Sequence, residues 1–189
     1  MNGNEVIDLA RRTYLEEFAR FVARQSDRFR HGAAEVQTVN SGETVWFGGH
    51  YRVDFIGQQG DKPVPVDLVP DNRVSLDVPL DGAAGTMRVR MEQIVWDDVE
   101  ISHNAPGDLT TSLRLWFEHW YDPDDRRKAA ESGGAVDVIH ALGIFPGKLR
   151  VDFGSASTNA FWALVALLRD AGASAITIRE TRPRPPVAN

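Results

Sequence analysis

The alternation of apolar and polar residues between positions 43 and 92 constrains the fold of this chain most strongly. Successive side chains on a strand point to opposite faces of a sheet, so a period of two predicts strands with one buried face. The turn sequences GQQGDK, PDN and DGAAG separate the alternating runs. The segment therefore predicts an antiparallel β-meander. Its apolar positions are Val53, Phe55, Val64, Val66, Leu68, Val74, Leu76, Val78, Leu80, Met87, Val89 and Met91.

The alternation also predicts how the last two strands of the meander pair. If Val78 lies opposite Met87, the apolar residues of both strands share one face. Asp77 then lies opposite Arg88 on the other face, and such opposite-charge pairs stabilise a sheet by about 0.2–1 kcal/mol each. A shift by one residue would turn the apolar set outward, so we expect this register.

The first hairpin of the meander gives a second prediction of register. Pairing Val53 with Val66 keeps the apolar residues of both strands together. The same pairing sets Arg52 opposite Asp67, which is another opposite-charge pair across the strands.

Helical spacing replaces the strand pattern on both sides of the meander. Residues 4–30 predict a long amphipathic helix that stops at Gly32. Residues 113–131 predict a central helix pair, because Asp122 precedes a proline. The first helix should end there, and Asp122 should cap the second, with Pro123 in its first position.

The C-terminal part predicts a βαβ unit. Residues 136–142 fit a strand or a short helix, and a turn at FPGK follows them. The unit itself is a strand at 149–153, a helix at 158–171 and a strand at 175–179. We therefore expect a single α+β domain over residues 1–182, with helices packed on the apolar face of the sheet. Residues 183–189 are rich in proline and predict a mobile tail.

Composition and charge exclude several classes of protein. The chain of 189 residues has no cysteine, which excludes disulfides and thiol catalysis and agrees with a reducing cytoplasm. Its longest apolar run, AFWALVALL, is far shorter than a membrane span of about 20 residues, so we expect a soluble protein. Sixteen acidic and six basic residues between positions 43 and 125 disfavour nucleic acid and favour a basic partner.

The loop GSAST after the strand at 149–153 resembles a phosphate or nucleophile loop only superficially. It lacks the GxxxxGK[ST], GxGxxG and GxSxG patterns. Ser157, followed by Thr158 and Asn159, instead predicts the N-cap of the following helix. The five histidines show no metal-ligand spacing, so the sequence predicts neither a metal nor another cofactor.

Two classes of function remain open. The first is an acidic binding or inhibitor-type protein that engages a basic protein partner; immunity proteins share its size and charge, a comparison of composition alone. Trp46, next to a Gly-Gly pair, would supply an exposed aromatic ring at such an interface, and Asp67 and Asp71 would supply charge.

The second class is a small enzyme with a carboxylate and histidine site. Asp97 lies beside an expected β-bulge, a feature that occurs near active sites. His50, Asp54 and His103 come from scattered strands of the prediction and would complete the site. The sequence favours the first class, because no pattern of residues specifies catalysis, and it leaves the oligomeric state open.

Overall fold

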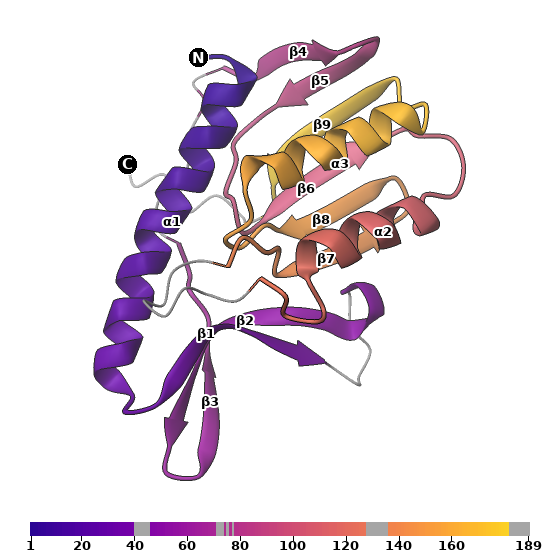
Figure 1. Cartoon of the computed structure of the whole chain (residues 1–189). Coiled ribbons are helices and arrows are strands. Elements are labelled where there is room, and N and C mark those ends of the chain that lie inside the picture. Colours follow the sequence, from indigo (N-terminus) through magenta and orange to yellow (C-terminus); the bar gives the residue numbers. More distant parts are fainter. Residues whose placement is uncertain (40–45, 71–73, 75, 77, 128–135, 182–189) are drawn as a thin grey trace.

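The computed structural model describes the chain except residues 40–45, 71–73, 75, 77, 128–135 and 182–189 (Figure 1). Helices and strands both contribute, and the predicted α+β class is confirmed. The predicted tail and Asp71 lie outside the described residues. The elements are α1 (Gly3–Arg28), β1 (Gly32–Val39), η1 (Phe47–Gly49), β2 (His50–Gln59), β3 (Lys62–Val66), β4 (Leu80–Ala84), β5 (Met87–Met91), β6 (Val99–His103), α2 (Thr110–Tyr121), β7 (Ala141–Phe145), β8 (Lys148–Asp152), α3 (Thr158–Asp170) and β9 (Ala175–Glu180).

The strands form two sheets. Sheet A is antiparallel with the order β1-β2-β3, and sheet B is mixed with the order β4-β5-β9-β6-β8-β7. The two sheets meet where β2 and η1 approach β7, and an isolated bridge joins Trp46 to Gly143 at this seam. Figure 1 shows sheet A below sheet B, with α1 running past both.

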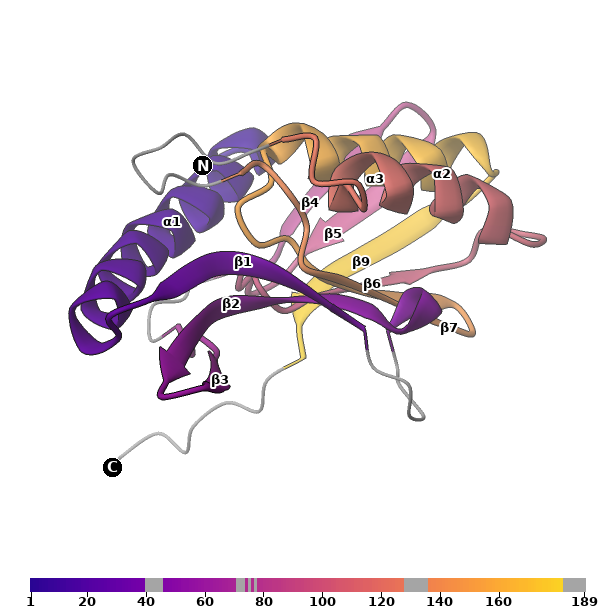
Figure 2. The ribbon, with the colours of Figure 1, turned by 60° about the horizontal axis from the view of Figure 1, so that its bottom comes forward.

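The helices α1, α2 and α3 lie on one side of sheet B (Figure 2). The core fills the space between them and the sheet, with Trp96, Phe153 and Phe161 fully buried at its centre. The predicted long N-terminal helix is confirmed, and Asn2 and Glu5 form a capping box at its start. No helix among the described residues is long and apolar enough to cross a membrane.

The predicted single meander is wrong, because β3 and β4 belong to different sheets. The register of the last hairpin is also wrong: Met87 lies opposite Ala84, and Val78 is 74% exposed. The turn is the two-residue connection 85–86, with Gly85 at a φ of 63°, so part of DGAAG extends as strand. Arg88 consequently lies opposite Ala83, and Asp77 lies outside the described residues.

The first hairpin differs from its predicted register by two residues. Phe55, and not Val53, lies opposite Val66. A shift of two keeps the same side chains on the same face, so the predicted apolar face survives. Arg52 is not opposite Asp67 as predicted; its side chain is buried against the end of α2.

The predicted helix pair is only half present. α2 ends at Tyr121 as expected, and Asp122 adopts the left-handed conformation with a φ of 54°. Residues 123–127 form turns and no helix, and the rest of the predicted second helix lies outside the described residues. An Asp122 carboxylate oxygen accepts a hydrogen bond from the Arg127 amide at 2.6 Å, which closes a turn and caps no helix.

The predicted βαβ unit is confirmed. α3 connects β8 to β9, and both strands run antiparallel to β6, which lies between them. The two strands are therefore parallel, and each boundary lies within one or two residues of its prediction. Ser157 occupies the predicted N-cap position of α3, but its side chain makes no capping hydrogen bond.

Candidate functional site

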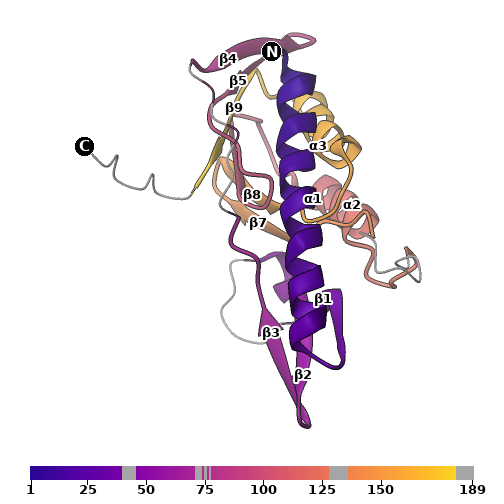
Figure 3. The same cartoon turned by 90° about the vertical axis from the view of Figure 1, so that its left-hand side faces the viewer.

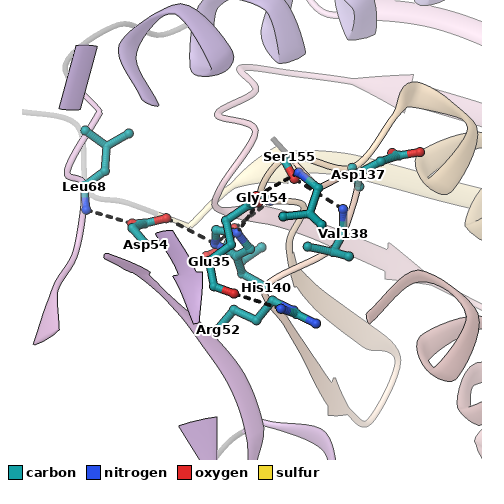
Figure 4. A network of polar contacts seen from close by, with 12 residues as sticks. Glu35, Arg52, Asp54, Leu68, Asp137, Val138, His140, Gly154 and Ser155 are labelled. Carbon is teal, nitrogen blue, oxygen red and sulfur yellow. Dashed lines mark hydrogen bonds and ion pairs between the residues drawn. The ribbon is translucent and has the colours of Figure 1, made fainter. Parts of the chain in front are cut away.

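His140 lies at the seam between the two sheets. Its backbone N–H donates to the Asp152 carbonyl on β8 at 2.9 Å, and its carbonyl accepts from the Arg52 N–H on β2 at 2.8 Å. These two bonds fix the residue in place, and its side chain is 1% exposed. Figure 4 shows this side chain inside a network of polar contacts drawn from several strands.

Carboxylates surround the imidazole ring. Nε2 lies 3.0 Å from Oε1 of Glu35, and Nδ1 lies 3.2 Å from Oδ1 of Asp54 and 3.9 Å from Oδ1 of Asp152. Burial alone would lower the pKa of His140, but these carboxylates outweigh it and raise the pKa well above its ordinary value. The surroundings therefore favour a buried imidazolium, with carboxylates from three strands within 3.9 Å of its ring nitrogens.

Glu35 reaches His140 through an unusual backbone. It lies within β1 at a φ of 52°, where a residue other than glycine is rare, and it forms no ladder pair with Asp54. Its Oε2 accepts from the Val136 N–H at 2.9 Å. Burial acts to raise the pKa of Glu35, but the hydrogen bond and charge of His140 lower it below its ordinary value. Backbone strain of this kind is concentrated at functional sites.

Asp54 connects the network to helix α1 and to the chain after β3. Its Oδ1 accepts from the Tyr14 hydroxyl at 3.2 Å, and its Oδ2 accepts from the Leu68 N–H at 2.7 Å. Burial, and then the Asp54 carboxylate, raise the pKa of Tyr14 well above its ordinary value, so the phenol stays a donor. The carboxylate is thus held from two sides while it faces His140.

Asp152 is the member of the network that reaches solvent, with 26% of its side chain exposed. Burial and the carboxylates of Asp97 and Asp54 raise its pKa well above the ordinary value, against the opposing charge of His140. The Gly154 N–H donates to its Oδ1 at 2.9 Å. Gly154 has a φ of 47°, and an added Cβ there would lie 2.2 Å from the His140 ring, so only glycine fits.

A pocket of about 290 Å³ has Asp152 in its lining. Two arginines lie in its wall, but each is occupied: Arg52 bonds to carbonyls at the end of α2, and Arg150 pairs with Asp98 at 2.8 Å. Burial and the Asp54 carboxylate raise the pKa of Asp67. The lining of the pocket has five aspartates against two arginines, so acidic groups outnumber basic ones. Its lining residues are Trp46, Tyr51, Arg52, Asp54, Asp67, Leu68, Asp97, Asp98, Ala141, Arg150 and Asp152.

The pocket brings together candidates from both functional classes read from the sequence. Trp46 and Asp67, expected at a partner interface, line it, and so do Asp54 and Asp97, expected in an enzyme site. Asp71, the third expected interface residue, lies outside the described part of the chain.

The two histidines of the expected enzyme site do not reach this pocket. His50 packs against the rings of Phe117 and Tyr121, with centroid distances of 6.5 and 5.8 Å. His103 lies at the end of β6, where burial lowers its pKa. The histidine that joins Asp54 is His140, because β7 adjoins β2 at the seam between the sheets.

Sequence reasoning missed Glu35, His140 and Asp152. The alternation of Ala34 and Val36 with the polar Glu35 and Gln37 could have indicated β1, and with it Glu35. His140 stands in the apolar run VIHAL, where one buried polar residue suggests a satisfied network.

The GSAST loop supports the site from behind. Ser155 is fully buried, and its hydroxyl accepts from the Val138 N–H at 3.3 Å. The guanidinium of Arg11, on α1, donates to the carbonyls of Ser155 and Ala156 at 3.2 and 2.7 Å. These bonds fix the connection between Asp152 and α3, so the serines serve the architecture.

The acids of the pocket do not converge as metal ligands. Within the described ranges, no group of three or more histidine, aspartate or glutamate side chains has a geometry that could hold a metal ion. Spread carboxylates of this kind suit a cation that is bound through several hydrogen bonds. Comparison with protein-family models, curated proteins and solved structures finds no significant match. Function is therefore inferred from the pocket and from the His140 network.

Proposed function

We propose that the protein is a cytoplasmic binding protein that engages a basic protein partner by accepting a cationic side chain in the aspartate pocket. One observation carries the proposal: five aspartates line the pocket against two arginines, of which Arg150 pairs with Asp98 and Arg52 bonds to carbonyls at the end of α2. A positive group from a partner would complete the balance of charge.

The raised pKa values of Asp152 and Asp67 support a cationic ligand. Each carboxyl group resists ionisation because it is partly buried and lies near other acids. A ligand cation would reverse this, because opposite charges attract more strongly in a pocket than in bulk water. A bound cation would therefore lower the pKa of both carboxyl groups and favour their ionised forms.

The guanidinium of arginine fits the pocket better than the ammonium of lysine. Its planar group donates to carboxylates two bonds at a time and stacks on aromatic rings. The pocket offers separated carboxylates at Asp54, Asp97 and Asp152, together with the aromatic residues Trp46 and Tyr51. Arg150 lies over the Trp46 ring, at 5.8 Å from its centroid, so one guanidinium of this chain already contacts this wall of the pocket.

Replacing Asp152 with asparagine tests the proposal. We expect the binding free energy for a short arginine-containing peptide, measured by calorimetry, to become less favourable by about 2–5 kcal/mol. This is the usual cost of removing one member of a buried charge pair. Asp61→Asn is the matched control, because Asp61 is an exposed aspartate outside the pocket. Equal affinities of wild type and D152N, or equal losses in D152N and D61N, would refute the cation pocket.

The same peptide should bind more tightly as the pH rises. Asp152 has to be ionised to bind a cation, and its pKa in the free protein is raised. The bound cation lowers this pKa, so binding releases a proton at pH values between the pKa of the complex and that of the free protein. Calorimetry in buffers of different ionisation enthalpy measures this proton. D152N should lose most of the release, and a wild-type affinity that falls as the pH rises would contradict the proposed role.

An acid–base enzyme is the second candidate. It is favoured by the raised pKa of Asp152, because a general acid needs a pKa nearer to the working pH than that of an ordinary aspartate. Asp54 and Asp97 would supply carboxylates on the same pocket, and His140 would position two of the three acids. Turnover of a small molecule without a protein partner, lost in D152N, would favour this candidate over binding.

A further inference from the structure

Strand β4 forms an open edge of sheet B. It pairs with β5 alone among the described strands, and Figure 3 shows it at the outer end of the sheet. The opposite edge, at β7, is covered by the Trp46–Gly143 bridge and by the bond from Arg52 to His140. An open strand edge presents unpaired backbone groups to any chain that can pair with it.

The register identifies which backbone groups of β4 are free. The Arg88 N–H donates to the Ser174 carbonyl at 3.0 Å, on the β9 side of β5, so Arg88 turns its backbone away from β4. Ala83, directly opposite, therefore directs its N–H and C=O away from β5. Asp81, two residues earlier, has the same orientation, and both residues are exposed.

The edge carries little protection against pairing. Its residues are Leu80, Asp81, Gly82, Ala83 and Ala84, without the lysine, proline or bulge that usually blunts an edge. Asp81, its one charged residue, pairs with Arg90 at 3.1 Å. A groove of about 390 Å³ runs beside the strand, lined by apolar residues that include Val89, Met91 and Trp162.

We propose that β4 pairs antiparallel with β4 of a second copy of this chain, about a twofold axis at Gly82. Asp81 of each copy then lies opposite Ala83 of the other, and each such pair exchanges both backbone hydrogen bonds. An axis at Asp81 would set Ala83 opposite Pro79, which has no N–H to donate. The register centred on Gly82 therefore satisfies the free groups of the edge.

The side chains are complementary in this register. Arg88 is exposed and forms no ion pair among the described residues, and its neighbour across the strand is the small Ala83. It can therefore reach across Ala83 to Asp81 of the second copy. On the other face, Leu80 of each copy lies opposite Ala84 of its partner and extends the apolar surface beside the groove.

The mass of the full-length protein in sedimentation experiments over a wide concentration range tests the dimer. We expect a concentration-dependent equilibrium between monomer and dimer, because one strand pair and its groove bury less surface than a permanent interface. Ala83→Pro should raise the dissociation constant about tenfold or more, since it removes an outward N–H but none of the bonds to β5. Ala83→Ser is the control, because it keeps that N–H, and it should dimerise as wild type does.

Two further measurements distinguish loss of the dimer from poor folding of A83P. Arg88→Glu changes an exposed side chain and should also weaken the dimer. Amide exchange of Asp81 and Ala83 should slow as wild-type concentration rises. A wild type that stays monomeric throughout, dimers that R88E and A83P leave unchanged, or association only with a different protein would each overturn the proposal. None of these outcomes depends on the aspartate pocket, so the cation proposal stands or fails separately.

Discussion

Replacing His140 with asparagine is expected to lower the free energy of unfolding by about 3–5 kcal/mol, the usual cost of breaking a buried ion pair. The reason is the charge left behind: the Glu35 side chain is 1% exposed, and the imidazolium is the cation beside it, 3.0 Å away. Asparagine is too short to replace both ring nitrogens. Urea unfolding at mildly acidic pH measures the effect.

Two companion variants separate the charge effect from lost packing. In the double variant Glu35→Gln with His140→Asn, no uncompensated Glu35 charge remains, so the loss should be smaller than the sum of the two single losses. His31→Asn is the matched control, because His31 is exposed, and its effect should stay within about 0.5 kcal/mol. A His140→Asn protein as stable as H31N would show that the buried pair contributes nothing.

The pH dependence of this loss has a definite sign. His140 has a raised pKa, so its contribution is fully present below the ordinary value of 6.5 and is lost as the pH rises through the raised pKa. Glu35 has a lowered pKa, so its contribution is present above 4.5 and is lost as the pH falls through the lowered pKa. The difference between wild type and H140N should therefore be largest between pH 4.5 and 6.5. A difference that grows above this range would contradict the assignment.

The local sequence pattern predicted those helices and strands whose formation depends on residues close by in the sequence. Helix α1 and the β8-α3-β9 unit follow from periodicity and turn residues, so their bounds differ little from the prediction. Pairing between strands was less predictable, because the same stretch of sequence can form turns of different lengths, and each turn length sets a different register. In the last hairpin we expected a longer turn, but the structure has a two-residue turn that begins at Gly85. Every residue pair of the hairpin therefore differs from the prediction.

The candidate site could be predicted only in part for the same reason. Asp54, Asp67, Asp97 and Trp46 were identified as candidates, and all four line the pocket. Glu35 and His140 are 105 positions apart, and no periodicity within a strand indicates that β1 and β7 approach one another. Their contact arises from the junction of the two sheets, which depends on tertiary packing.

Replacing Arg52 with methionine should destabilise the protein by about 3–5 kcal/mol, because it takes the guanidinium donor away from the buried carbonyl groups of Glu35 and Tyr121. The Arg52 side chain is 3% exposed. Its guanidinium donates to the carbonyls of Glu35 at 2.8 Å, Tyr121 at 2.8 Å and Asp122 at 3.1 Å. It also pairs with Asp125 at 2.9 Å and lies over the Tyr121 ring. One side chain thus joins β1 and β2 to the end of α2.

Arg52→Lys tests whether geometry or charge matters in this contact. The ammonium of lysine keeps the charge. It lacks the planar, spread donors of a guanidinium, so it cannot hydrogen-bond at once to carbonyls from two separate elements. We therefore expect R52K to lose about 1.5–3 kcal/mol, between wild type and R52M. Arg20→Met is the control, because Arg20 is exposed on α1, and it should unfold as wild type does. If R52K were as stable as wild type, a positive charge near the end of α2 would be enough to stabilise this contact. The hydrogen bonds of the guanidinium would then not be required to join the helix to sheet A.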